Sequence, residues 1–356
     1  MGLSEVSILV FWVCVQLNLA QVLLSFNQNQ VSNYISWKDF SVDEQRFPWD
    51  PIAGDRVIVV DQHGRGHSRT VQGAVDMVPD NNPERMKICI YPGIYREKVY
   101  VPRTKGYVSM IGGRNERESA VITWNSKSSD IGFDGQEIGT YDSATVTVES
   151  DYFCATRLTF ENSVEAVSGG DGMQGVALRV DSERAMFYRV RIKGEQDSLL
   201  DNTGTHYFYQ CQIQGKIDFI FGNSKSLYQN CDLHSVAETY GAIAAHHRDA
   251  ENEDTGFSFV NCSITGTGSV YLGRAWGDHS RIIYSLCYMD DIIIPEGWTD
   301  WNHTSRQMTA VFGEYQCEGI GADRRRRVKW SKFLSNEEAR PFLDRSFING
   351  DQWLNL

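Results

Sequence analysis

The residues best suited to chemistry in this chain are acids and amides that recur beside short apolar segments. Gln174 precedes "GVALRV", and Gln196 and Asp197 follow a glycine in "GEQDSLL". Asp218 stands inside "IDFIFG", 21 residues beyond Asp197. Two neighbouring carboxyl groups oppose each other's ionisation, so one can be protonated while the other is charged. Such a pair suits a nucleophile beside a general acid, and uncharged amide donors suit the oxyanion of acyl transfer.

A later segment, "YLGRAWGDHS", adds Arg274 and Trp276. A guanidinium can pair with Asp218 and keep it ionised, and an indole can stack on a sugar ring. Taken singly, an acid such as Asp197 is more often a turn or cap residue than a catalyst, and a tryptophan is more often a core anchor. The chemical interpretation therefore depends on a fold that brings these residues together.

A loose repeat from residue 153 onward predicts such a fold. An aromatic residue is followed by a small apolar residue or Cys and then a branched aliphatic in "FCATRLTF", "FYRVRI", "FYQCQI", "LYQNCDL", "FVNCSI" and "IYSLCYM". The equivalent positions, spaced by 32, 21, 20, 31 and 25 residues, are Leu158, Val190, Cys211, Cys231, Cys262 and Cys287. A constant local pattern with uneven spacing favours the stacked coils of a parallel β-helix. Asp197 and Asp218 would then project side by side from adjacent coils, with both glutamines alongside.

The other segments also indicate an all-β protein. Short runs such as "DRVIVV", "KICIYPG", "VSMIGG", "AVITW" and "ATVTV" are separated by turn-forming residues. An antiparallel sandwich could supply the same strands, and the repeat favours the β-helix over it. One short helix is expected near the N-terminus, in "SRTVQGAVDMVP", where Val71, Ala74, Val75 and Val78 share a face before Pro79. Within "IDFIFG", strand alternation predicts Phe219 and Phe221 facing inward and Asp218 facing out.

The N-terminus predicts export. Residues 6–25 are apolar and uncharged, as in a secretory signal peptide, although the preceding Glu5 and the absence of Lys or Arg are atypical. An uncleaved membrane anchor is the alternative. The predicted organisation is a signal peptide over residues 1–25, a polar linker over 26–45 and a catalytic domain over 46–356.

Charge and cysteine content exclude other functions. A formal net charge of −12 and a pI of about 5.2 argue against a nucleic-acid-binding protein. The run Arg324 to Arg327 could hold a polyanion, although such runs are usually solvated faces. No CxxC pair or histidine pattern suggests a metal site. A disulfide is expected, if anywhere, between Cys231 and Cys262, because stacked strands lie about 4.8 Å apart.

Eight segments, in order along the chain, resemble those of plant pectin methylesterases, or pectinesterases, between residues 55 and 356. They are "VIVVDQHGRGHSRTVQGAV", "YPGIYREKVYV", "ATVTVESDYFCATRLTFENS", "MQGVALRV", "GEQDSLL", "IDFIFGNSKSLYQNC", "YLGRAW" and "FGEYQCEGIGADRRRRVKW". The resemblance implies a right-handed single-stranded parallel β-helix that removes methyl groups from cell-wall homogalacturonan. It releases methanol and pectate without a cofactor.

The resemblance also implies a role for each candidate residue. Asp218 would attack the C6 ester carbonyl as nucleophile. Asp197 would protonate the departing methanol and then activate water. Gln174 and Gln196 would stabilise the oxyanion.

Substrate contacts are implied for Gln174, Arg274 and Trp276, with Arg274 also holding Asp218. The family's LGRPW motif reads Leu272-Gly273-Arg274-Ala275-Trp276 here. Loss of the rigid proline is expected to loosen the placement of Arg274.

A secreted, monomeric wall enzyme of the form without an inhibitor-like pro-region is expected, with no nucleic acid or membrane as partner after signal cleavage. The sequons at Asn261 and Asn302 fit a secreted glycoprotein. Whether a proteinaceous pectinesterase inhibitor binds stays open. Two other functions also stay open: an inactive pectin-binding wall protein, and another β-helical pectin-degrading enzyme, either a glycosidase or a lyase. Released methanol, reducing ends and unsaturated uronates would distinguish the three chemistries.

Overall fold

The computed structural model describes residues 34–42, 56–113, 120–165 and 170–356. The predicted signal peptide lies outside these residues. None of the helices in the described ranges is long and apolar enough to cross a membrane.

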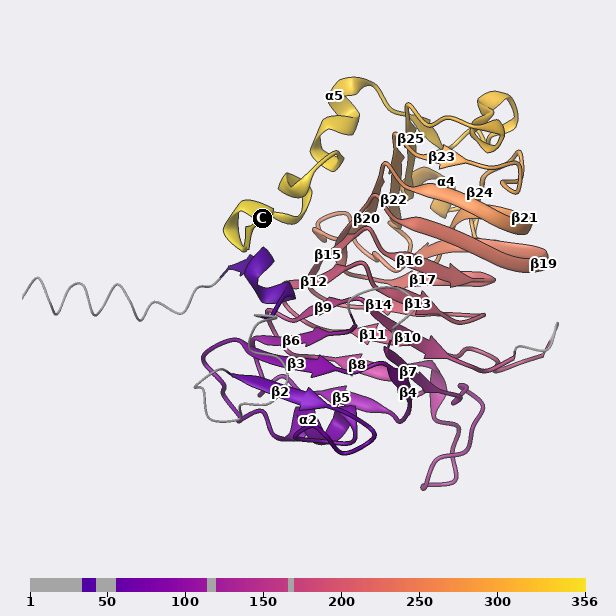
Figure 1. The fold of residues 1–356 in the computed structure, drawn as a ribbon. Coiled ribbons are helices and arrows are strands. Elements are labelled where there is room, and N and C mark those ends of the chain that lie inside the picture. The colour runs from indigo at the N-terminus through magenta and orange to yellow at the C-terminus, as the bar shows by residue number, and fades with distance from the viewer. Residues whose placement is uncertain (1–33, 43–55, 114–119, 166–169) are drawn as a thin grey trace, which may run out of the picture. The chain divides into compact units, whose positions relative to one another are not determined.

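Parallel strands stack coil upon coil into a β-helix (Figure 1). One face of the coils is an 11-stranded sheet, whose neighbouring strands are hydrogen-bonded in chain order. Its strands are β2 (Val57–Val60), β3 (Met86–Ile90), β6 (Val108–Ile111), β9 (Cys154–Thr156), β12 (Ala185–Tyr188), β15 (Thr205–Tyr209), β18 (Lys225–Gln229), β20 (Gly256–Val260), β22 (Arg281–Ser285), β25 (Val311–Tyr315) and β26 (Lys332–Phe333).

The other faces belong to a 14-stranded sheet. One face holds β4 (Gly93–Arg96), β7 (Ala120–Trp124), β10 (Leu158–Asn162), β13 (Arg191–Lys193), β16 (Gln212–Gly215) and β23 (Tyr288–Met289). The next holds β5 (Val99–Val101), β8 (Val146–Val148), β11 (Leu178–Val180), β14 (Leu199–Asp201), β17 (Ile217–Gly222) and β24 (Trp298–Thr299). Two long strands, β19 (Asp232–His246) and β21 (Ser263–Ala275), join the faces, because the first part of β19 pairs with β16 and its last part with β17.

The ladder register confirms the predicted repeat. Successive coils align Arg191 with Gln212, Gln212 with Asp232, Asp232 with Ser263 and Ser263 with Tyr288. The residue before each of these is the position that the sequence pattern identifies as equivalent. The antiparallel sandwich is therefore wrong.

A left-handed residue precedes each ladder position and turns the chain into the next face. These residues, with φ between 53° and 57°, are Arg157, Arg189, Gln210, Asn230, Asn261 and Leu286. The backbone turn is thus repeated at the same place in six coils.

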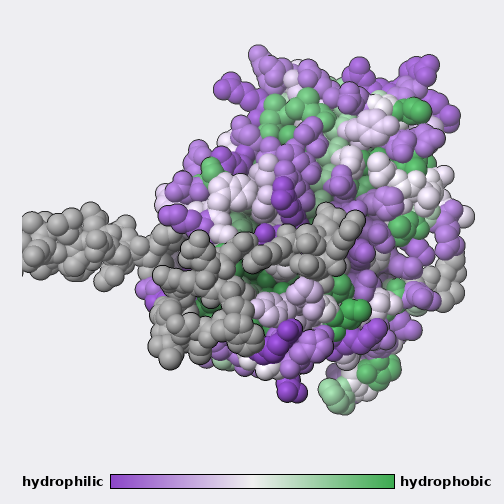
Figure 2. Space-filling view, viewed as in Figure 1, coloured by the Kyte–Doolittle hydropathy of each residue, from purple (hydrophilic) through white to green (hydrophobic). Residues whose placement is uncertain are grey.

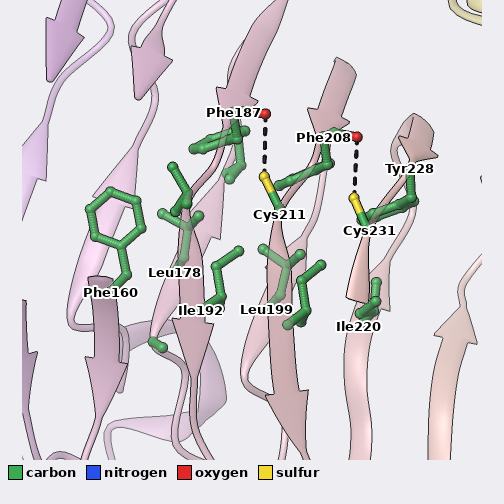
Figure 3. Close-up of a cluster of buried hydrophobic side chains, with 14 of the residues drawn as sticks. Phe160, Leu178, Phe187, Ile192, Leu199, Phe208, Cys211, Ile220, Tyr228 and Cys231 are labelled. Atoms are coloured by element: carbon green, nitrogen blue, oxygen red, sulfur yellow. Dashed lines mark hydrogen bonds between the residues drawn. The ribbon is translucent and has the colours of Figure 1, made fainter. Parts of the chain in front are cut away.

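The interior is mostly apolar and includes the ladder cysteines (Figure 3). The Cys211 thiol donates to the Phe187 carbonyl oxygen at 3.3 Å, and the Cys231 thiol donates to that of Phe208 at 3.4 Å. The Cys262 thiol repeats the contact one coil later. All seven cysteines of the described residues are free, so the expected Cys231–Cys262 disulfide is wrong. From Cys211 to Cys317, each ladder thiol donates to a carbonyl of the preceding coil instead of bonding to its neighbour.

The predicted N-terminal helix is confirmed as α2 (Val71–Asp76). The Thr70 side chain accepts from the Gly73 amide at 3.1 Å, and the Glu97 carboxylate accepts from the amides of Val71 and Gln72. Val71, Ala74 and Val75 are fully buried. Capping and one apolar face thus stabilise a helix too short to persist alone.

Part of the predicted linker is folded. Strand β1 (Ile35–Ser36) pairs in parallel with β27 (Leu354–Asn355), and a 3-10 helix, η1 (Trp37–Phe40), follows it. Ile35 and Phe40 are buried in a second apolar cluster that includes Trp353. The linker prediction therefore does not hold for residues 34–42.

The remaining helices are short and lie in loops or at the C-terminal end. They are α3 (Gly139–Asp142), α4 (Arg306–Thr309), α5 (Asn336–Ala339), η4 (Ile320–Ala322), η5 (Arg324–Arg326), η6 (Arg340–Phe342), η7 (Arg345–Ile348) and η8 (Gly350–Gln352). Hydrophilic residues dominate the face drawn in Figure 2, and hydrophobic residues are scattered among them in small groups.

Candidate active site

Asp197 and Asp218 come from adjacent coils and lie side by side. The Asp197 amide donates to the Ile217 carbonyl at 3.1 Å, and Gln196 forms a β-bridge with Ile217. Two residues further on, Leu199 pairs with Ile220 in the same register. The spacing of 21 residues therefore corresponds to one coil.

Both acids sit at distorted points of the backbone. Asp197 has φ of 63° and Asp218 has φ of 46°, in the left-handed region that few non-glycine residues adopt. At Asp218 the register between β17 and β19 shifts, because three steps from Ile217 to Ile220 face two steps on the partner strand. Strained backbone of this kind clusters at functional sites.

This bulge changes which side chains face inward. Phe219 and Ile220 both belong to the interior cluster, whereas Phe221 packs outside it, with its ring 5.9 Å from that of Trp276. The prediction that Phe221 faces inward is wrong, because simple alternation does not survive an inserted residue. Asp218 is buried between the two environments.

Arg274 forms a bidentate ion pair with the Asp218 carboxylate. Its Nε donates to Oδ1 at 2.7 Å, and its Nη2 donates to Oδ2. The guanidinium carbon lies 3.6 Å from the ring centroid of Trp301, and Tyr240 interacts with the same guanidinium. Arg274 is thus contacted by a carboxylate, an indole and a phenol.

The two acids differ in how readily they ionise. Burial raises the pKa of Asp197 well above its usual value, the Asp218 charge raises it further, and Arg274 opposes the rise. Burial also raises the pKa of Asp218, but the hydrogen bonds and charge of Arg274 counteract it. Asp218 therefore loses its proton before Asp197 does, which divides the pair into a charged group and an acid.

The effect of Ala275 on the placement of Arg274 stays a prediction. Ala275 is fully buried at the end of β21, opposite His246, and its carbonyl oxygen accepts from Arg306 Nη1 at 2.8 Å. Arg274, the preceding residue, is held by its contacts with Asp218 and Trp301.

The two glutamines lie on the coils before Asp218. The Ser128 hydroxyl donates to Gln174 Oε1 at 2.6 Å, which leaves the amide N–H groups of Gln174 to donate elsewhere. The Gly175 amide donates to the Gln196 carbonyl at 3.1 Å and joins the two coils. The side-chain amide of Gln196 is half-buried and forms no hydrogen bond with another described residue.

An apolar strip borders the acids. Trp276 contacts the His247 ring at 4.3 Å and, with Trp301, packs on a cluster formed by Ala144, Val176, Leu200, Phe221 and Ala245. Aromatic faces beside polar groups suit a sugar chain.

Four contributors escaped the sequence reasoning. Ser128 lies in a loop and Tyr240 on the long strand β19, and neither stands in a distinctive sequence pattern. Phe221 is predicted to face the interior but packs outside it. Trp301 stands in "EGWTDW", whose paired tryptophans are the one signal that could have drawn attention to it.

The arginine run at residues 324–327 pairs within the protein. Arg325 binds Asp323, Arg326 approaches Glu296, and the buried Arg327 donates to Glu314 at 2.8 Å. Arg324 stacks on Phe333. These contacts favour the solvated-face interpretation over a polyanion clamp for the exposed Arg324, Arg325 and Arg326, whereas Arg327 is buried in an ion pair.

Comparison with known proteins places the chain among its relatives. A sequence model described as Pectinesterase matches residues 57–351. Pectinesterase QRT1 of Arabidopsis thaliana is 55% identical over 374 residues, covering 99% of this chain and 98% of that protein. Putative pectinesterase 11 of Arabidopsis thaliana is 40% identical over 300 residues, covering 84% and 80%.

Solved structures agree with the fold. A pectin methylesterase from carrot has a TM-score of 0.77 and 33% identity, covering 86% of this chain and 96% of that chain. A pectin methylesterase from Aspergillus niger has a TM-score of 0.71 and 27% identity, covering 86% and 98%.

Proposed function

The chain belongs to the pectinesterase family, and on that premise we propose that it hydrolyses the methyl esters of cell-wall homogalacturonan through Asp218. It is a carboxylic ester hydrolase that converts pectin and water to pectate and methanol. The bidentate contact between Arg274 and Asp218, beside an acid of raised pKa, is the observation that carries the assignment of Asp218.

Asp218 begins the reaction as the nucleophile. One carboxylate oxygen attacks the C6 carbonyl carbon, and the carbonyl electrons move onto its oxygen. The amide donors of Gln174 and Gln196 stabilise this oxyanion. When the oxyanion collapses, the bond to the methoxyl oxygen breaks and Asp197 gives that oxygen its proton, so methanol leaves.

Water completes the cycle. The acyl group is now joined to Asp218 as an anhydride, and Asp197 is a carboxylate. Asp197 takes a proton from water, whose oxygen attacks the acyl carbon, and Asp218 departs as a carboxylate. The uronic acid is released, and both acids regain their starting protonation states.

Arg274 and Trp276 bind the sugar chain in this proposal. The half-buried Trp276 offers a ring face on the apolar strip, and Arg274 contacts the substrate beside Asp218. Gln174 also contacts the substrate.

The cellular setting is part of the proposal. A signal peptide over residues 1–25 would direct a monomeric protein to the cell wall, where Asn261 and Asn302 are candidate glycosylation sites. A proteinaceous inhibitor is a further candidate partner. Expression of the full-length chain in plant cells, followed by detection of the protein in the cell-wall fraction, tests the proposed localisation.

Methanol release from highly methylated pectin tests the chemistry. The wild type is expected to release methanol, and Asp218→Asn and Asp197→Asn are expected to lose at least about a thousandfold in kcat. Gln212→Asn, an exposed strand residue outside the site, serves as the control. A wild type inactive at every pH, or Asn variants with full activity, would refute the mechanism.

A further inference from the structure

We propose that Trp301 is a positioning residue for this reaction, which holds the Arg274 guanidinium in the orientation that grips Asp218. The inference rests on the proposed function. Trp301 acts through Arg274 and takes no part in bond making or breaking.

The stacking distance sets this contact apart. The guanidinium carbon of Arg274 lies 3.6 Å from the Trp301 ring centroid. In the described residues, the other arginine–aromatic contacts range from 4.9 to 5.9 Å. A separation near van der Waals contact means that the ring lies directly on the guanidinium and limits its movement.

The backbone at Trp301 supports the same conclusion independently. Trp301 and Asn302 have consecutive left-handed φ values of 59° and 62°. Such a conformation is an outlier for a bulky side chain and persists only where the surroundings impose it. Strain held at this point is explained if the ring must face Arg274.

Asp300 imposes that turn. Its Oδ1 accepts from the Asn302 amide at 3.0 Å, its carbonyl accepts from the His303 amide at 3.0 Å, and Gln307 Nε2 donates to its Oδ2 at 2.7 Å. Strand β24, immediately before the turn, pairs with β21 at Gly273 and Arg274. The turn is therefore fixed to the strand that carries the arginine.

Core packing alone is the competing explanation. Trp301 packs on the apolar cluster around Phe221 and is half-buried, so truncation would cost some stability in either case. Packing does not predict an effect on the ionisation of Asp218, whereas positioning does. The discriminating measurement is therefore a pH profile.

The charged groups around Asp218 define the expected shift. Asp197 faces it from the preceding coil, Tyr240 from β19 and Arg274 from β21, and of these only Arg274 stabilises the negative charge. Without the indole, water reaches the guanidinium and weakens its attraction for the carboxylate. Asp218 then needs a higher pH to ionise.

Steady-state methanol release by Trp301→Leu tests the proposal. We expect kcat to fall roughly three- to thirtyfold, as loss of one desolvated cation–π contact predicts, with a smaller rise in KM because Arg274 also contacts the substrate. The acidic limb of kcat/KM should move to higher pH by about one unit. Trp301→Phe, which keeps a smaller ring, should lie between wild type and Trp301→Leu on both measures.

Phe333→Leu is the matched control, because it removes an exposed ring from another arginine, Arg324, outside the site. It should leave kcat and the acidic limb unchanged. An unshifted acidic limb in Trp301→Leu, or a rise in KM alone, overturns the proposal. If Trp301→Leu does not fold, Trp301→Phe decides by the same criterion.

The wild type and Asp218→Asn separate this inference from the function on which it rests. A wild type without methanol release removes the proposed function. If the wild type is active, Asp218→Asn is inactive and the pH profile of Trp301→Leu matches that of wild type, only the proposed role of Trp301 is refuted. The proposed function then stands.

Discussion

Two carboxyl groups four residues apart, Asp197 and Asp201, have opposite electrostatic environments. Asp201 is fully buried inside the coils, where Tyr228 donates to its Oδ2 at 2.5 Å and His206 Nδ1 lies 2.5 Å from its Oδ1. Burial would raise the pKa of Asp201, but the charge and hydrogen bond of His206, with bonds from Ser226 and Tyr228, lower it overall.

Asp197 lacks this support. Its carboxyl accepts no hydrogen bond from the other described residues, and burial together with the Asp218 charge raises its pKa. Hydrogen-bond donors and a cation surround Asp201, whereas Asp197 lacks them and has a raised pKa. The comparison teaches that burial alone does not set the direction of a carboxyl pKa shift, because the donors and charges around the group decide it.

His206 completes the interior network as a cation. Its Nε2 lies 2.7 Å from the Ser182 carbonyl oxygen, so both ring nitrogens face acceptors and both must donate. Burial would lower the pKa of His206, but Asp201 raises it above its usual value.

Removing the interior charge should have the largest effect on stability. Asp201→Asn leaves the His206 cation without its counter-ion, and breaking such a buried pair typically costs about 3–5 kcal/mol. Urea unfolding followed by circular dichroism measures the loss. Asp197→Asn is the matched variant, and its stability should equal or exceed that of wild type because a half-buried acid without a hydrogen-bond donor is removed. Equal losses in the two variants would contradict the distinction.

The pH dependence of stability should separate the regions next. Above the unfolded-state pKa of His206, which is near the ordinary histidine value of 6.5, the folded protein keeps a proton that the unfolded chain releases. The free energy of unfolding should then fall by up to about 1.4 kcal/mol per pH unit until pH exceeds the folded-state pKa. The raised pKa of Asp197 also makes the free energy of unfolding fall as pH rises, beginning at lower pH. The measurement therefore compares Asp197→Asn with the double variant Asp197→Asn/His206→Gln, so that Asp197 does not contribute. A slope unaffected by His206→Gln would rule out the buried imidazolium.

The smallest expected effect concerns the orientation of one amide. Ser128→Ala removes the donor to Gln174 Oε1, and a neutral hydrogen bond of about 1 kcal/mol corresponds to roughly fivefold in kcat. KM should change little, and Ser128→Thr should restore the rate because it keeps the hydroxyl. Ser163→Ala, which alters an exposed serine bonded to a backbone carbonyl, is the control. A rise in KM with unchanged kcat would place Ser128 in substrate binding instead.

The sequence predicted the coil arrangement well because a β-helix repeats the same local pattern. The interval between Asp197 and Asp218 matched one coil, so register alone brought the acids together. The predicted positions of the ladder cysteines are confirmed, but the predicted disulfide is wrong, because proximity between coils does not fix where a thiol points.

Features that depend on single distortions were not predictable in this way. The bulge at Asp218 reverses the side of the strand on which Phe221 lies. Sequence spacing does not predict the extra residue that forms this bulge. Ser128 and Trp301 reach the site from loops whose course depends on tertiary contacts. The folded part of residues 34–42 was missed because its partner, β27, lies at the far end of the chain.

The pairing of β1 with β27 has a consequence for the order of folding. Each coil contacts the one before it, so coils can add in turn as the chain leaves the ribosome. Ile35 must wait for Leu354, with which it is in register, and its burial closes the longest loop that the described residues contain. Loop-closure entropy makes so distant a contact slow to form. The two ends of the described range therefore complete one another's structure, and disrupting either strand would leave the same aromatic cluster uncovered.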